Sequence, residues 1–358
     1  MDATWDDLIT PMQLLKSSFA KMIYFSLAMK KRLFIHIWFL ITAIVSLQAQ
    51  EPGIPSALYT TSGSVLSMTD SMPPLQITAG FYHTIPLAQF NNQGDWTQQG
   101  DASDLYRTAI FFALRRSLDK HFTVGICVPW YRTSLTYHGT KHPPGNYGIS
   151  QVSDIRLLLA YHFKTGRFLV SSEIGTNVPV GNGLGEALHP AFPPGENGYW
   201  TLWGKTTAWL KINGEMALYG MFSYDFITPR SGALVEGSGA LLLSDSTTDV
   251  IQGTIHPGDR ITLNAGIVRR FSNNEIFLGY GFLYKSSAFV NNMIPDDERT
   301  INLVNYSISH RSLLHTVHSG CFHNWKQMKG GFMIQMGVGG NGSWSEFLLS
   351  GIISYNLK

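Results

Sequence analysis

Apolar and polar residues alternate with a period of two along most of the chain after residue 75. Within 215–226, Met216, Leu218 and Phe226 share one face, and Glu215 and Asp225 share the other. Successive side chains of a strand point to opposite faces, so a period of two is typical of strands. The strand candidates are 75–84, 105–116, 121–137, 151–163, 167–180, 199–212, 215–228, 258–271, 275–286, 300–311, 314–326, 330–339 and 345–357.

The connections between these candidates are of two kinds. Segments 117–120, 164–166, 213–214 and 272–274 are short and read as hairpin turns. The others are long and rich in Gly, Pro, Asn and Asp. Short periplasmic turns that alternate with long extracellular loops are typical of outer-membrane barrels. The long loops are 85–104, 139–150, 181–198, 229–257 and 287–299.

The strands and their connections predict an all-β fold, a transmembrane antiparallel up-and-down β-barrel over residues 75–358. A soluble β-sandwich would carry polar residues on its exposed face, and its loops would be less regularly asymmetric. Thirteen candidates are an odd number, whereas bacterial single-chain barrels have an even number of strands. Since 300–326 alternates poorly, we expect about 12 strands, within a range of 12–14.

Composition supports a membrane barrel and excludes other classes. Charged residues are 14% of the chain, below the ~25% of soluble proteins, and the mean hydropathy is +0.01. After residue 50 no apolar run is as long as a spanning helix, which excludes a helical membrane protein. The net charge of +2 is too small to indicate a nucleic-acid partner.

The N-terminal region predicts export. Residues 29–50 begin with Met-Lys-Lys-Arg and continue into an apolar run at 33–47, which is short for a spanning helix and has the length of a signal-peptide core. We therefore expect a cleaved signal peptide at 29–50 and an upstream extension at 1–28, with Met29 as the true start. Residues 51–74 are expected to form a periplasmic lead-in or a plug.

Several charged residues fall on the face opposite the apolar one. An Arg or Lys that faces lipid near the midplane costs ~2–4 kcal/mol, so these residues are expected to line the lumen. Two interpretations stay open: the charges tune solute choice in a conduit, or they form a salt-bridged filling. The predicted lumen-lining residues are Arg107, Arg115, Asp154, Arg156, Glu173, Lys205, Glu215, Asp225 and Arg270.

Prolines and aromatic residues add two further expectations. Pro129 and Pro179 cannot donate to a strand ladder, so they are predicted to mark places where pairing loosens. The excess of Trp and Tyr is typical of the aromatic girdles at membrane interfaces. The candidates for these girdles are Trp130, Trp200, Trp203, Trp209, Tyr224 and Tyr284.

The segment 310–323 gathers His310, His315, His318 and His323, with Ser319 next to His318. A Ser–His pair could serve a barrel lipid hydrolase, but no third member is evident, and strand histidines can equally line a wet lumen. We expect no enzyme, metal site or cofactor. Cys127 and Cys321 could form one disulfide in an exported chain.

The chain resembles the outer-membrane barrel family known as MetA-pathway of phenol degradation transporters, which are similar to fatty-acid channels. The likeness lies in "DIRLLLAYHF", in "FLVSSEIGTNVPVGN" with its Pro179-Val180-Gly181 step, in "ALYGMFSYDF" and in "FTVGICVPWYR". The resemblance covers about 75–300. It implies passive uptake of small apolar or aromatic compounds across the bacterial outer membrane.

The expected function is therefore an outer-membrane channel for small, hydrophobic or aromatic solutes, through the lumen or a lateral gap. Two alternatives are a structural or partner-binding barrel with a blocked lumen and the lipid hydrolase. The expected partners are outer-membrane lipid, a small-molecule solute and, during biogenesis, the barrel-assembly machinery.

Overall fold

In the computed structural model, all the described residues belong to one compact unit, 48–358. They are residues 73–90, 96–97, 103–137, 145–152, 154–180, 200–234, 251–256, 258–287, 289–294, 311–341 and 344–357. The predicted extension, signal peptide and lead-in up to residue 72, and strand candidate 300–311 apart from its last residue, lie outside these ranges.

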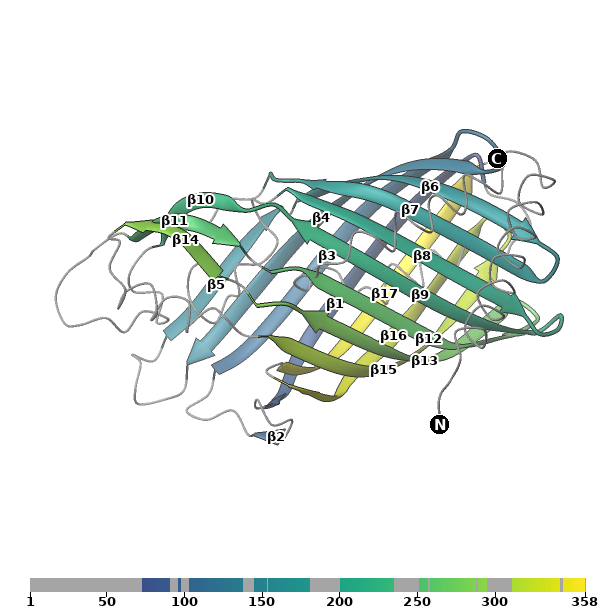
Figure 1. Cartoon of the computed structure of the whole chain (residues 1–358). Coiled ribbons are helices and arrows are strands. Elements are labelled where there is room, and N and C mark those ends of the chain that lie inside the picture. The colour runs from purple at the N-terminus through teal and green to yellow at the C-terminus, as the bar shows by residue number, and fades with distance from the viewer. Residues whose placement is uncertain are drawn as a thin grey trace, which may run out of the picture. The chain divides into compact units, whose positions relative to one another are not determined.

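Twelve strands of the described chain close into an antiparallel barrel (Figure 1). Each pairs with its neighbour in the ring, and the last strand pairs with the first, with Leu75 opposite Leu357. This confirms the predicted fold class and the lower end of the predicted strand range. The ring contains β1 (Leu75–Phe90), β3 (Ser103–Ser117), β4 (Phe122–Tyr137), β6 (Ile155–Thr165), β7 (Phe168–Val178), β8 (Thr201–Lys211), β9 (Met216–Ile227), β12 (Arg260–Phe271), β13 (Asn274–Lys285), β15 (Ser312–Trp325), β16 (Met328–Asn341) and β17 (Trp344–Leu357).

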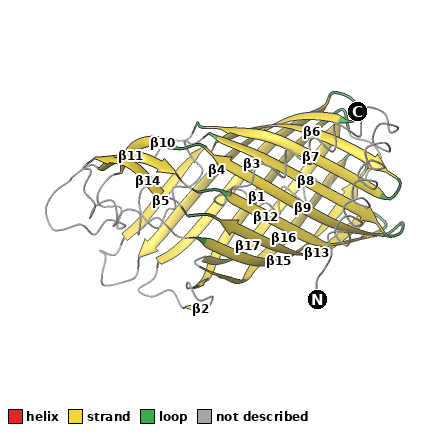
Figure 2. Cartoon of the chain, in the orientation of Figure 1, coloured by secondary structure: helices red, strands yellow, loops and turns green. Residues whose placement is uncertain are grey.

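Tight turns join strands at one end of the barrel, which we call the turn end (Figure 2). Gly166, Ser272 and Lys326 have positive φ there, as tight hairpin turns require. In the turn before β4, Oδ1 of Asp119 accepts backbone N–H bonds from residues 121 and 122. These bonds lower the pKa of the Asp119 carboxyl and fix the turn. The turns lie at 118–121, 166–167, 212–215, 272–273 and 326–327.

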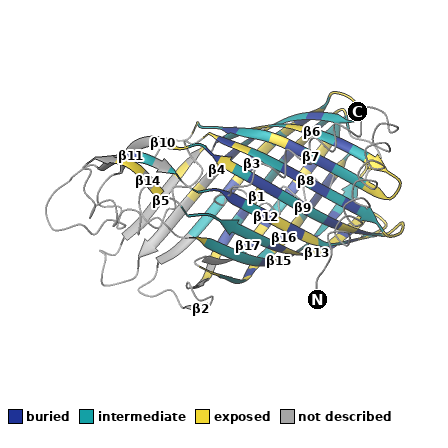
Figure 3. Cartoon of the chain, in the orientation of Figure 1, coloured by how far each residue is buried: buried dark blue, intermediate teal, exposed yellow. Residues whose placement is uncertain are grey.

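The two faces of the wall differ, as the alternation predicts (Figure 3). Phe81, Phe112, Leu278 and Phe332 point outward and are 45%, 61%, 54% and 56% exposed. Their sequence neighbours on the other face are mostly buried or half-buried. Exposed apolar side chains all round a closed barrel form the kind of belt that faces lipid.

Four of the five predicted long loops contain described strand residues, and this corrects the sequence-based picture. β5 (Gly145–Val152) extends the wall beside β4, and β2 (Trp96–Thr97) pairs with the end of β1. β10 (Arg230–Leu234), β11 (Ile251–His256) and β14 (Phe289–Ile294) form a separate three-stranded sheet. These three strands adjoin β9, β12 and β13 in the chain, at the end of the barrel opposite the turns (Figure 1).

No helix within the described ranges is long and apolar enough to cross a membrane.

Candidate functional site on the inner wall of the barrel

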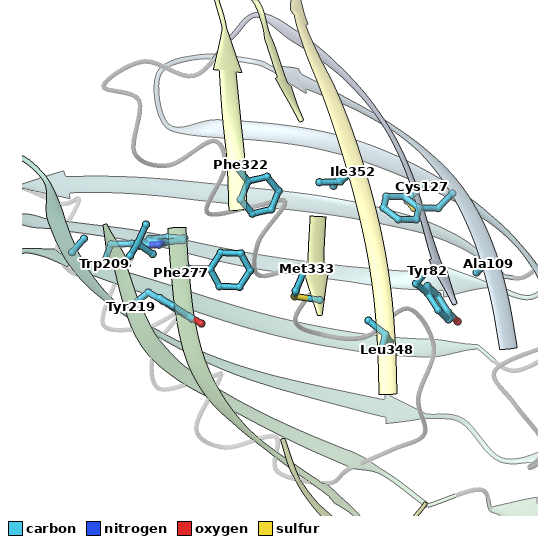
Figure 4. Close-up of a cluster of buried hydrophobic side chains, with 13 residues drawn as sticks. Tyr82, Ala109, Cys127, Trp209, Tyr219, Phe277, Phe322, Met333, Leu348 and Ile352 are labelled. Carbon is cyan, nitrogen blue, oxygen red and sulfur yellow. The ribbon is translucent and has the colours of Figure 1, made fainter. Parts of the chain in front are cut away.

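Thirteen buried apolar side chains form one cluster on the inner face of the barrel (Figure 4). They come from strands on most sides of the ring, so side chains far apart in the sequence meet inside the wall. Inward-facing rings and aliphatic chains disfavour ions and favour apolar matter. The cluster contains Tyr82, Ala109, Phe111, Cys127, Trp209, Ala217, Tyr219, Val268, Phe277, Phe322, Met333, Leu348 and Ile352.

A line of ring contacts runs through part of this cluster. Tyr219 and Phe277 both contact the imidazole of His318, with ring centroids 6.3 and 6.1 Å apart. Phe277 stacks on Phe322 at 5.7 Å, and Nζ of Lys329 lies 5.6 Å from the Phe322 ring centroid. The line therefore joins the apolar cluster to a charged group near the turn end.

Tyr219 and His318 are also hydrogen-bonded, with 2.5 Å between the tyrosine hydroxyl and Nε2. Both lie in one row of the sheet, and β12 and β13 contribute Gly266 and Gly279 to the same row between them. A Cβ on Gly279 would meet both the hydroxyl and Nε2. The two glycines therefore leave the space that the Tyr219–His318 pair occupies.

Two buried carboxylates each hold two cations. Glu173 lies 3.3 Å from the guanidinium of Arg115 and 2.9 Å from Nζ of Lys205. Glu275 lies 2.5 Å from Arg270 and also pairs with Lys329. These groups reach across strands, because Arg115 is on β3 and Glu173 is on β7. Removing one member of a buried ion pair costs more stability than the intact pair contributes. Each group therefore constrains which residues the wall can carry at these positions.

The predicted lumen residues fall into three groups by burial. Glu215 stands apart: it lies in the turn before β9, its side chain is 67% exposed, and it is 3.8 Å from Arg269. Asp225 lies 3.4 Å from Arg260. The buried residues of the prediction are Arg115, Asp154, Glu173 and Lys205, and the half-buried ones are Arg107, Arg156, Asp225 and Arg270.

Sequence reasoning missed several inward-facing polar residues. Arg260 shares its face with Arg270, and Glu275 shares its face with Gly279, so the alternation already contained the signal. Lys329 lies just before the strand candidate that begins at 330. Trp209 was expected in an interface girdle, yet it is 2% exposed and belongs to the inner cluster.

The two predicted prolines lie on either side of an irregularity in the wall. Pairing of β4 with β6 ends at Cys127, and pairing of β4 with β5 begins at Trp130, so Pro129 lies in the interruption. Across β6, the ladder with β7 ends just before Pro179. Asp154 lies between the two prolines, and its Oδ1 accepts a hydrogen bond from the Val180 N–H at 3.3 Å.

The barrel wall separates the members of the histidine-rich segment. His318 points inward and is 2% exposed. Its neighbour Ser319 lies on the opposite face, where its hydroxyl donates to the Phe277 carbonyl at 3.1 Å. These two side chains therefore do not form a Ser–His nucleophile pair. His315 and His323 also lie on the outer face, and His310 is outside the described residues.

Two other chemical expectations can be compared with the structure. Cys127 and Cys321 are both free, so they do not form the disulfide considered from the sequence. Where the chain is described, no three His, Cys, Asp or Glu side chains lie together as a metal site would need.

Comparisons with known proteins identify the fold. No family model and no curated protein matches the chain. The barrel is similar to the COG4313 outer membrane channel from Pseudomonas putida F1, with a TM-score of 0.60 and 10% identity, over 79% of this chain and 95% of that one. The translocator domain of autotransporter NalP from Neisseria meningitidis gives a TM-score of 0.45 and 10% identity, over 84% and 96%. A mutant of the TodX monoaromatic hydrocarbon channel gives 0.41 and 9%, over 87% and 96%. At 10% identity the likeness to the Pseudomonas channel concerns the fold, and this chain therefore has the barrel fold of an outer-membrane channel.

Proposed function

We propose that the protein is a channel of the bacterial outer membrane that admits small apolar or aromatic solutes passively. The inner cluster of rings and aliphatic side chains carries this proposal, because these groups give an apolar solute a surface to contact beside the buried charged and polar residues of the same wall. The exposed apolar belt and the fold shared with an outer-membrane channel support the membrane location. The predicted signal at 29–50 is consistent with export.

Phe111 and Phe112 provide a matched test, since they are neighbours on β3 that point to opposite faces. Phe111 is 3% exposed and belongs to the inner cluster, whereas Phe112 is 61% exposed. The full chain in liposomes should admit a neutral aromatic probe faster than a sugar of similar size. Phe111→Ala should change this preference and the ion conductance several-fold, and Phe112→Ala should change neither. Phe111→Leu serves as a second variant if the alanine variant folds poorly.

The opposite result would overturn the proposal. If Phe111→Ala and Phe112→Ala behave alike in a correctly inserted barrel, the inner cluster does not control passage.

The path of the solute is a second part of the proposal. We infer that the wall loosens at Pro129 and Pro179, because Pro129 lies in the gap between the β4–β6 and β4–β5 ladders and the β6–β7 ladder ends just before Pro179. This place could serve as a lateral gap. A disulfide between cysteines placed at Val128 and Ile155 should lower uptake of the aromatic probe if solute leaves here. Uptake that is the same before and after reduction would exclude this route.

A partner-binding barrel with a blocked lumen is the second candidate. Two observations favour it: the burial of the inner cluster, and the three-stranded sheet at the end of the barrel opposite the turns, which we call the loop end. An inserted barrel that conducts no ions and admits neither the aromatic probe nor the sugar would support this alternative.

A further inference from the structure

Exposed cations gather at the turn end of the barrel. Among the described residues of that end, Asp119 and Glu215 are the exposed acids, and both are engaged: Asp119 by backbone N–H groups and Glu215 by Arg269 at 3.8 Å. Cations therefore outnumber acids around this rim. The exposed cations, in or beside four of the five tight connections, are Arg116, Lys120, Lys164, Arg167, Arg269 and Lys326.

Two of these cations belong to the outer face of the wall. On β3, Arg116 continues the outward series that contains Phe112 and Leu114, which are 61% and 43% exposed. On β12, Arg269 continues the outward series that contains Leu263, which is 43% exposed. Both guanidinium groups therefore lie at the edge of the apolar belt, on the side that would face lipid.

Exposed aromatic side chains lie at the same level of the wall. The guanidinium of Arg269 lies 4.7 Å from the centroid of the Phe271 ring, which is 38% exposed. Trp325 is 50% exposed at the end of β15, and Tyr355 donates its hydroxyl proton to Gln327 at 2.8 Å. Aromatic rings of this kind mark the headgroup level of a bilayer.

We propose that this rim, Arg116 and Arg269 with the exposed aromatic residues beside them, binds the phosphate groups of anionic phospholipids in the leaflet at the turn end. An acidic protein partner would meet the tips of the turns, whereas these two arginines lie on the wall itself, next to residues of the apolar belt. An anionic lipid matches both parts of this surface, because its phosphate meets the guanidinium and its chains meet the belt. The proposal rests on the membrane location in the proposed function and is independent of solute passage.

Each Lys or Arg near an anionic bilayer surface strengthens binding to the anionic lipid by about fivefold at low salt, and added salt screens this effect. The full chain in nanodiscs of phosphatidylcholine with a minor share of phosphatidylglycerol should therefore retain phosphatidylglycerol above its share of the bilayer. Native mass spectrometry of the released barrel measures this enrichment. The double variant Arg116→Gln with Arg269→Gln should lower the enrichment by fivefold or more, and higher NaCl should lower it in the unchanged protein.

Arg132 provides the matched control. It is an exposed, outward-facing arginine on β4, at the loop end of the wall, so Arg132→Gln should leave the enrichment unchanged. Inorganic phosphate should displace no more phosphatidylglycerol than chloride does at equal ionic strength.

Each opposite result overturns the proposal. These results are no enrichment in an inserted barrel, enrichment that survives the double variant, an equal loss in Arg132→Gln, or displacement specific to free phosphate. A chain that does not insert into bilayers would contradict the membrane location as well, so the two failures are distinguishable.

Discussion

Tyr219 and His318 are 99 positions apart in the sequence and share a 2.5 Å hydrogen bond inside the barrel. Two strands lie between them, and both strands have glycine in that row of the sheet. A residue with a side chain at Gly279 would occupy the place where the hydroxyl and the imidazole meet. The pair therefore depends on four positions from four strands, and its loss should be detectable from any of them.

Removing the tyrosine hydroxyl tests the hydrogen bond itself. Tyr219→Phe keeps the ring but leaves Nε2 of a buried histidine without its partner, which costs about 1–3 kcal/mol of unfolding free energy. Urea unfolding in lipid vesicles measures this loss. Tyr280→Phe is the control, because its hydroxyl bonds His315 at an exposed site, and the variant should lose much less. Equal losses in the two variants would contradict a special role for the buried pair.

Gly279→Ala tests the space that the pair needs. The added methyl group would collide with the Tyr219 hydroxyl and His318 Nε2, and overpacking of this kind costs about 1–3 kcal/mol. Gly220→Ala on β9 is the matched control, because a Cβ there meets nothing within 4 Å. It should be neutral or slightly stabilising. A Gly279→Ala barrel as stable as Gly220→Ala would show that the pair moves aside freely.

The buried carboxylate of Glu173 should matter far more than an exposed one. Glu173→Gln leaves Arg115 and Lys205 in a buried site without the charge that pairs them, which costs about 3–5 kcal/mol. Glu215→Gln removes an exposed partner of Arg269 and should cost about 0–1 kcal/mol. The unfolding temperature of each barrel ranks the two variants. It is measured by heating the protein and following the change in its mobility on a gel. Similar unfolding temperatures would contradict the buried ion group.

Much of the fold could be predicted from the sequence, because each ring strand carries its own signal. Alternation depends only on the face to which each side chain points. A one-residue slip of register would move every side chain of a strand to the opposite face. The tight turns were visible for a similar reason, since residues such as Asn213 and Gly166 fix a hairpin locally. Candidate 300–311 lies almost wholly outside the described residues, and the twelve remaining candidates each correspond to one strand of the ring.

The inner site could be predicted only in part, because alternation gives the face of a residue and not its neighbours. Trp209 was assigned to an interface by its residue type, yet its position on β8 places it inward. No spacing rule connects Arg115 on β3 with Glu173 on β7, since their contact depends on the curvature of the closed wall. Strands β10, β11 and β14 within the long loops were also missed, because these short strands pair with each other and need no apolar face.

Asp259 should make the stability of the barrel depend on pH. It lies in the connection before β12, where burial and, to a smaller extent, the nearby Asp225 carboxylate raise the pKa of its carboxyl to about 6, although a backbone hydrogen bond at Ile227 opposes the shift. In the unfolded chain this pKa is about 3.9. Between these two values the folded protein binds more protons than the unfolded chain, so stability is lost as pH rises from about 4 through 6.

Asp259→Asn tests this dependence, because an amide does not ionise. Urea unfolding in vesicles measures the unfolding free energy at pH 4 and at pH 7. From pH 4 to pH 7 this free energy should fall less in the variant than in the unchanged protein. Asp119→Asn is the control, because backbone N–H groups lower the pKa of that carboxyl, so its contribution is lost only as pH falls below the unfolded pKa of about 3.9, and this variant should change the pH 4 to pH 7 difference little. Since both variants exchange one carboxyl for an amide, a shift of similar size in both would reflect the loss of charge alone. It would contradict the burial of Asp259 as the cause.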